Sequence, residues 1–263
     1  MSKAASTSAG PGGARITAIT SGKGGVGKTV VAANLAAALA RAGRRVLVLD
    51  ADLGLANLDV VLNLAAKLTL HDVFTGRTVL DEALQPAPGG FSVLLAGSGL
   101  VEYSRMTPEV RDKLLALVAQ VRPRFDHVLL DTGAGISDVV LFTVSLADEV
   151  LVVATPEPTS LTDAYATIKV LAATQAARPL RLLVNQVQRK GEGRTVQSQL
   201  QRVVDRFVNA DLAAPLKLGL LGEVPLDAAV RESIQQRRLL MDTQPGSPAA
   251  VALVAAAGRL LRR

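Results

Sequence analysis

Short apolar runs alternate along the chain with longer segments of helical pattern. Runs rich in Val, Leu and Ile predict strands at 15–20, 45–50, 91–97, 127–131, 149–155, 180–187 and 217–224. The intervening segments predict helices at 29–42, 108–121, 137–147, 160–176 and 195–209. Several of the strands are apolar almost throughout, as expected of strands buried on both faces of a parallel sheet. The alternation therefore predicts an α/β fold with a single open, mostly parallel β-sheet and helices on both faces.

No linker divides this pattern, so we expect one domain over residues 15–263, preceded by a disordered tail over residues 1–14. The tail is small and polar and lacks the apolar core of a secretory signal. No apolar run approaches the roughly 18 residues that span a bilayer. The chain has no cysteine, which excludes disulfides and thiolate chemistry and agrees with a cytoplasmic protein.

The net charge of +6 permits contact with nucleic acid or anionic lipid. The charges are nevertheless scattered, and aromatic residues make up only 3% of the chain, too few for a base-stacking platform. The composition favours a solvated basic surface over a dedicated site for a polyanion, which stays open as the alternative.

The segment GKGGVGKT, residues 22–29, fits the phosphate-loop pattern G-x-x-x-x-G-K-S/T between a predicted strand and a predicted helix. Backbone N–H groups of such a loop, together with the helix N-terminus, bind phosphate. Lys28 would neutralise β- and γ-phosphate charge, and the Thr29 hydroxyl would ligate Mg²⁺. The candidate nucleotide-binding residues of the loop are Gly22, Lys23, Gly24, Gly25, Val26, Gly27, Lys28, Thr29 and Val30. The expected ligands are ATP and Mg²⁺.

Carboxylates follow two of the predicted strands at the edge where a parallel sheet binds its ligands. Asp50 and Asp52 end the strand at 45–50, and Asp131 ends the strand at 127–131 in a Walker B pattern. We expect Asp52 to position the attacking water, and Asp50 and Asp131 to support the water shell of the metal. Gly133 and Gly135 would let the following loop approach the γ-phosphate and move after hydrolysis.

Other polar residues are less specific. His71 and His127 lack metal-ligand spacing and are expected to lie at the surface or at helix caps. Asn185 ends an apolar strand, where it could bind a base or form a strand-end turn. Lys23 has two interpretations on the loop motif alone: a solvated lysine, or a second cation directed at phosphate.

The sequence KGGVGKT, with its leading lysine, resembles the deviant Walker A box of the MinD/ParA class of ATPases. DADLGLANLD is similar to the switch I of that class, and DTGAGIS to its switch II. DLGLANLDVVLNL, TLHDVFTGRTVLDEAL, DTGAGISDVVLF, EPTSLTDAYATIKVL and VVDRFV together resemble the FlhG/FleN (YlxH-like) regulators of flagellar number. EPTSLTDAYATIKVL is the most specific of these segments, because phosphate binding does not require it.

The resemblance implies a slow regulatory ATPase that dimerises when ATP is bound and separates after hydrolysis. It implies that Lys23 contacts the partner's nucleotide across the dimer, that Asn185, Pro225 and Leu226 hold the adenine, and that Asn57 lies near the dimer face. The partners that it implies are a flagellar transcription activator (FleQ-like), a signal-recognition-type GTPase (FlhF-like) or a switch-complex protein. It further implies transient localisation at the inner membrane or the cell pole.

Two segments differ from that family. The N-terminal tail lacks the Gln-containing helix that stimulates the partner GTPase in many relatives, which favours the transcription-regulator branch. The terminal segment SPAAVALVAAAGRLLRR could be a membrane-targeting helix, with Leu260, Leu261 and arginines for lipid. It lacks Trp and Phe, however, so we expect it to pack on the domain, with weak membrane contact at most.

Two rival functions remain open from the sequence. One is a ParA-type partitioning ATPase that binds DNA nonspecifically as an ATP dimer. The other is an enzyme that transfers phosphate to a small molecule, although no second substrate pocket is indicated. The EPTSLTDAYATIKVL segment favours the flagellar regulator.

Overall fold

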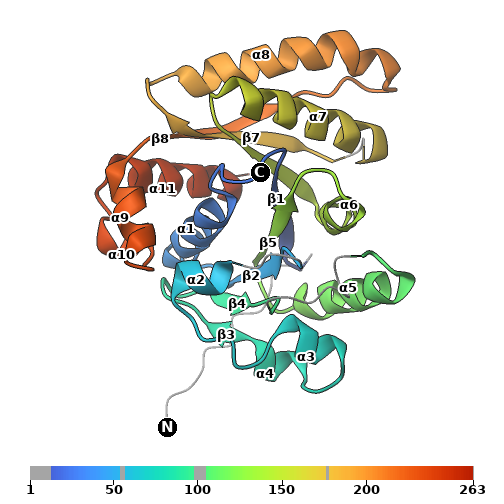
Figure 1. Cartoon of the computed structure of the whole chain (residues 1–263), viewed down its shortest axis with the longest axis vertical. Helices are drawn as coiled ribbons and strands as arrows, with labels where there is room; N and C mark the ends of the chain where they lie inside the picture. Colours follow the sequence, from blue (N-terminus) through green and yellow to red (C-terminus); the bar gives the residue numbers. More distant parts are fainter. Residues whose placement is uncertain (1–12, 54–56, 98–104, 176–177, 263) are drawn as a thin grey trace.

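The computed structural model describes residues 13–53, 57–97, 105–175 and 178–262, and Figure 1 traces the chain. Its centre is one eight-stranded sheet with the strand order β3-β4-β2-β5-β1-β6-β7-β8. All neighbouring strands are parallel except β3, which is antiparallel to β4 at the sheet edge. The strands are β1 (Arg15–Ser21), β2 (Val46–Ala51), β3 (Gln85–Pro86), β4 (Ser92–Leu94), β5 (His127–Ala134), β6 (Glu149–Ala154), β7 (Leu180–Val187) and β8 (Gly219–Pro225).

Helices cover both faces of the sheet and bury two apolar layers (Figure 1). Alternate residues of the inner strands face opposite layers, as with Leu47 and Val48 of β2. One face is covered by α1 (Lys28–Arg41), α2 (Leu58–Leu62), α9 (Ala228–Gln235), α10 (Leu240–Thr243) and α11 (Pro248–Leu261). The other is covered by α3 (Leu70–Phe74), α4 (Leu80–Ala83), α5 (Pro108–Val121), α6 (Asp138–Ser145), α7 (Pro158–Gln175) and α8 (Glu192–Phe207). The predicted fold class is confirmed.

The sequence pattern located the seven parallel strands and the longer helices to within a few residues. It missed β3 and the short helices α2, α3, α4, α9 and α10, as well as the 3₁₀ turn Asn209–Asp211. Helices this short are not stable by themselves and form because tertiary contacts fix them. The helix predicted from residue 195 begins at Glu192, whose carboxylate accepts hydrogen bonds from the backbone N–H groups of Gln188 and Arg189.

The terminal segment forms α11 and packs on the domain, as expected. The Ser247 hydroxyl accepts a hydrogen bond from the Ala250 N–H at the start of the helix, and Pro248 occupies its first turn. Leu253 and Leu260 are buried in the layer that α11 shares with α1 and β8, so Leu260 is not available to lipid. Among the described residues, no helix combines the length and hydropathy that a bilayer crossing requires.

Two further expectations concern the chain start and the histidines. The proposed tail falls mostly on residues 1–12, which lie outside the described residues; Ala14 is already buried and donates a hydrogen bond to the Arg122 carbonyl. The surface position expected for His127 is wrong. This residue begins β5 and is only 8% exposed, and its burial, followed by the charges of Arg15 and Arg44, lowers its pKa.

Candidate functional site

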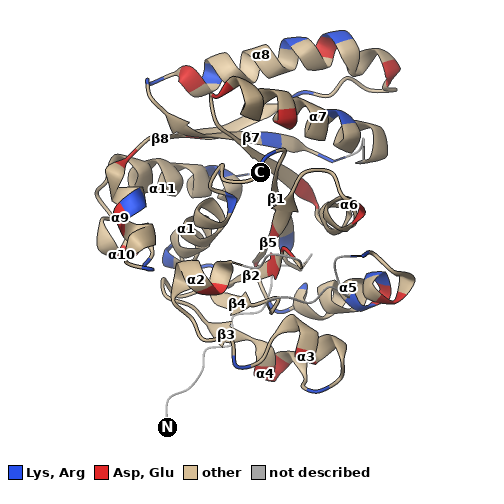
Figure 2. Cartoon of the chain, viewed as in Figure 1, with Lys and Arg blue, Asp and Glu red and all other residues tan. Residues whose placement is uncertain are grey.

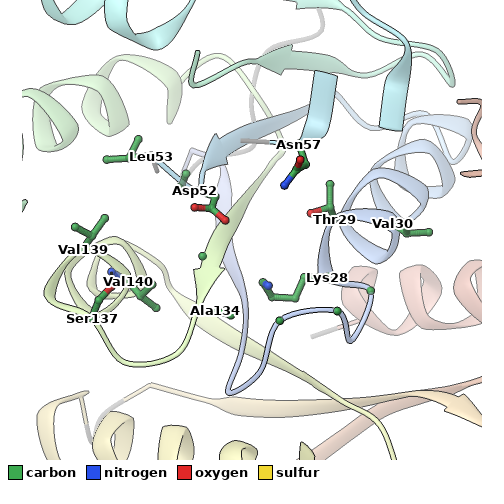
Figure 3. Close-up of a pocket in the computed structure, with 15 residues that line it drawn as sticks. Lys28, Thr29, Val30, Asp52, Leu53, Asn57, Ala134, Ser137, Val139 and Val140 are labelled. Atoms are coloured by element: carbon green, nitrogen blue, oxygen red, sulfur yellow. Dashed lines mark hydrogen bonds between the residues drawn. The ribbon is translucent and has the colours of Figure 1, made fainter. Parts of the chain in front are cut away.

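The phosphate-loop segment lies at the carboxyl end of the central strand β1, where it leads directly into α1. The ends of β2 and β5 lie on one side of it, because β5 is the neighbour of both β1 and β2. Side chains from three separate strand ends therefore meet around the loop, as Figure 3 shows. A parallel sheet binds ligands at this edge.

The loop curls because two of its glycines adopt a left-handed backbone: φ is +81° at Gly25 and +92° at Gly27. Helix α1 then begins at Lys28, and the Val31 N–H bonds back to the Gly27 carbonyl. The N–H groups of this first turn point towards the loop and provide a positive helix end for phosphate.

Asn185, at the end of β7, holds the loop from the opposite side. Its side-chain nitrogen donates a 2.8 Å hydrogen bond to the carbonyl of Val26. The approach is so close that a Cβ added to Gly27 would lie 2.6 Å from that nitrogen. Asn185 is thus a structural support of the phosphate loop, and its hydrogen bond to Val26 could not be predicted from the sequence pattern.

A first cavity of about 560 Å³ opens in front of the loop. Figure 3 shows the side chains of Lys28, Thr29, Asp52 and Asn57 around it. The cavity is lined by Gly24, Gly25, Gly27, Lys28, Thr29, Val30, Ala51, Asp52, Leu53, Asn57, Gly133, Ala134, Ser137, Val139 and Val140. Most of the predicted phosphate-site residues therefore converge. Part of the predicted switch I, residues 54–56, lies outside the described residues.

Asp50 and Asp131 lie beneath this cavity and are almost completely buried. Burial is the main cause that raises both pKa values. The pKa of Asp131 is raised to about 6. The pKa of Asp50 is raised well above its usual range, and the charge of Asp131 adds to the effect of burial there. The Thr29 hydroxyl and the Lys28 charge act in the opposite direction on Asp131.

One oxygen of each of these carboxylates, Asp50 Oδ2 and Asp131 Oδ1, is buried without a hydrogen-bond partner among the described residues. Buried unpaired carboxylate oxygens beside a threonine hydroxyl are costly unless a cation or its water shell satisfies them. Magnesium prefers such hard oxygen ligands and retains several waters. The residues present therefore fit the expected Mg²⁺.

A second cavity of about 530 Å³ adjoins the loop on the side of β7 and β8. It brings together Asn185, Pro225 and Leu226, the three residues implied to hold a base. Helix α9, which the sequence pattern had missed, also lines this cavity. Its lining residues are Val230, Arg231, Ile234 and Gln235. The sequence did contain a signal for the start of α9, because Asp227 directly follows VPL and is a typical N-cap residue. Its carboxylate accepts a hydrogen bond from the Ala229 N–H.

Other predicted residues lie outside both cavities. Val26 is buried in the core, and Gly22 packs against the backbone of α7, where a Cβ would lie 2.2 Å from the carbonyl carbon of Asp163. Lys23 is not among the described residues that line either cavity. Gly135 has φ +90°, and its N–H donates to the Ser21 carbonyl, so this loop is tied to the end of β1.

The segment after β5, including the start of α6, contributes more to the first cavity than the glycines singled out from the sequence. Ser137, Val139 and Val140 line the cavity from the start of α6. The Ser137 hydroxyl also accepts from the Val140 N–H and fixes this helix start. Ser137 ends the DTGAGIS segment, so the motif contained the residue although its side chain had no assigned role.

Comparisons with known proteins agree with this geometry. The sequence matches the ParA family, described as NUBPL iron-transfer P-loop NTPase, over residues 13–261. It is 42% identical to antiactivator FleN of Pseudomonas aeruginosa, over 94% of this chain and 86% of FleN. It is 33% identical to the flagellum site-determining protein YlxH of Helicobacter pylori, over 89% of this chain and 77% of YlxH. The structure of the septum site-determining protein MinD of Pyrococcus horikoshii, complexed with Mg-ADP, superposes with a TM-score of 0.78 at 27% identity, covering 95% of this chain and 96% of that one.

Proposed function

Because the chain belongs to the MinD/ParA family of P-loop NTPases, we propose that it is an ATP-dependent dimerising switch that regulates flagellar number or flagellar gene expression. The observation that carries the proposal is the 42% identity to antiactivator FleN, which extends over 94% of this chain. The identity to YlxH supports the same assignment. As in FleN, whose name describes an antiactivator, the expected partner is a protein that activates flagellar genes.

Lys28, Thr29 and Asp131 would hold the Mg²⁺-nucleotide in the first cavity. The loop N–H groups and the Lys28 ammonium would bind phosphate, while the Thr29 hydroxyl and the buried carboxylates of Asp50 and Asp131 would hold the metal, directly or through water. The metal, when bound, neutralises phosphate charge and polarises the bond that is broken. Burial raises the pKa values of Asp50 and Asp131, and a bound cation would oppose that effect by favouring the ionised form of both carboxyl groups.

Asp52 is proposed to orient the attacking water. It lines the first cavity at the end of β2, across from Lys28 (Figure 3). The Asp52 N–H bonds to Asp50 Oδ1 at 3.2 Å, which fixes the backbone of this position relative to the buried carboxylate. A carboxylate can accept a hydrogen bond from water and hold it for in-line attack on the γ-phosphate.

The base is proposed to occupy the second cavity between Asn185, Pro225 and Leu226. Leu226 is 64% exposed and provides an apolar surface for a base to cover. The two cavities share Gly25, Gly27 and Val30, so one nucleotide can extend from one cavity into the other.

Capture of partners by the ATP-bound form tests the proposal. Asp52→Ala protein should bind ATP without hydrolysing it and remain dimeric, so it is immobilised with ATP and exposed to candidate partners. Binding of a flagellar transcription activator or of a signal-recognition-type GTPase would support the flagellar assignment. ATP-dependent, salt-sensitive retention of arbitrary duplex DNA in place of any flagellar protein would contradict it and support a partitioning ATPase. Lys23 is proposed to contact the nucleotide of a second copy across the dimer, as the resemblance implies, so Lys23→Ala protein with ATP is the matched monomeric control.

A further inference from the structure

The side chain of Lys23 is held by its own subunit, on the segment that leads into α7. Its ammonium donates to the Thr159 hydroxyl at 3.2 Å and lies 3.5 Å from a carboxylate oxygen of Glu157. Both residues belong to the EPTS segment after β6, and α7 begins at Pro158 between them. The ammonium therefore contacts the start of α7, and Lys23 is not among the described residues that line either cavity.

Main-chain packing fixes both sides of this contact. On the loop side, the Ser21 hydroxyl donates to the Lys23 carbonyl at 2.8 Å, and Gly22 abuts the α7 backbone at Asp163. On the helix side, the Thr155 N–H donates to the Ser160 hydroxyl at 3.0 Å, which closes the turn that presents Glu157 and Thr159. The position of Lys23 opposite these two acceptors therefore follows from the packing of loop against helix.

We propose that Glu157 and Thr159 form a cis dock for Lys23, which keeps the ammonium on its own subunit until a second copy of the chain presents a bound nucleoside triphosphate. The dock rests on the proposed function, since it presumes that Lys23 crosses to the nucleotide of the second copy. Its effect is to oppose dimerisation, because both lysines must leave their docks before the ATP dimer closes.

The dock is weak enough to open. The Lys23 side chain is 43% exposed and that of Glu157 is 63% exposed, so water screens the pair. The positive N-terminal end of α7 lies next to the ammonium and opposes the attraction of Glu157. An exposed pair of this kind shifts an equilibrium about two- to five-fold. With one dock in each subunit, loss of both should strengthen dimerisation by roughly four- to twenty-five-fold.

The test compares dimerisation constants by sedimentation velocity in a non-hydrolysable ATP analogue and Mg²⁺. Glu157→Gln removes the charge of the dock, and Thr159→Val removes its hydroxyl with little change of shape. Glu109→Gln is the matched control, because Glu109 is also an exposed acid at a helix start and is also paired with a lysine, Lys113. It lies on the distant α5 (Figure 1), which carries both acidic and basic residues (Figure 2). Calorimetry checks that the affinity of each variant for the analogue at monomer concentrations equals that of the wild type.

The dock predicts a tighter dimer for Glu157→Gln, a smaller gain for Thr159→Val and no gain for Glu109→Gln, with the difference diminishing at high salt. An unchanged or weaker dimer for Glu157→Gln would overturn the dock, as would an equal gain in Glu109→Gln, which would indicate a general charge effect. Failure of the wild type to dimerise would instead refute the proposed switch, and the dock with it.

Discussion

Gly22→Ala is expected to destabilise the protein although it adds a single methyl group. The new Cβ would lie 2.2 Å from both the carbonyl carbon and oxygen of Asp163 and 2.7 Å from the Ala164 nitrogen. Ordinary van der Waals contact begins near 3.4 Å, so loop and helix must separate by about 1 Å. The atoms in the way belong to the backbone of α7, and Ala164 is buried, so no flexible side chain can yield. Overpacking of this kind costs typically 1–3 kcal/mol, and we expect at least 2 kcal/mol.

Urea unfolding of the nucleotide-free protein measures this cost. Gly24→Ala is the matched control, because a Cβ at Gly24 meets no described atom within 4 Å and its φ is not positive. We expect Gly24→Ala to unfold within about 0.5 kcal/mol of the wild type, since neither steric nor backbone strain arises there. Gly22→Ala protein as stable as Gly24→Ala would refute the close packing of the phosphate loop on α7.

Two further predictions concern the site. Burial raises the Asp131 pKa from 3.8 to about 6, so the folded protein holds a proton that the unfolded chain loses. The free energy of unfolding in Mg²⁺-free buffer should therefore fall as the pH rises from about 4 to 6. Asp131→Asn cannot ionise, so it should remove up to about 3 kcal/mol of that fall, measured by urea unfolding at pH 4 and pH 7. An identical pH dependence in the two proteins would contradict the raised Asp131 pKa. Asn185→Ala deletes the 2.8 Å bond to the Val26 carbonyl and should weaken ATP binding about three- to ten-fold in calorimetry, whereas unchanged affinity would show that the loop needs no such support.

The sequence contained most of the information for the sheet and for the phosphate site. Strands such as Val46–Ala51 are buried at every residue, so their apolar runs are unmistakable. Residues 22–29 follow β1 and lead into α1. The motif itself indicates that Lys28 and Thr29 lie at the start of this helix, beside the phosphate loop. Asp131 was predictable for the same reason, because the apolar run that precedes it is local in the sequence, although β5 continues past it to Ala134.

The contacts that the sequence did not reveal are long-range. Asn185 bonds to a residue 159 positions away, and Gly22 touches α7, which follows more than a hundred residues later. The pattern of apolar and polar residues does not indicate which strand end will lie against which loop. The lining of the second cavity was only partly predicted for a related reason, since α9 has eight residues and forms against the rest of the domain. The burial of His127 is likewise a property of the packed edge and not of its neighbours in the sequence.

The proposed role of Lys23 is to couple nucleotide binding to dimerisation. Sedimentation velocity of the wild type and of Lys23→Ala, each with saturating non-hydrolysable ATP analogue and Mg²⁺, tests it most directly. We expect a dimer for the wild type and a monomer for Lys23→Ala. Their nucleotide affinities should agree within a few-fold, because Lys23 is not among the described residues lining either cavity. A Lys23→Ala protein that dimerises as tightly as the wild type would contradict it.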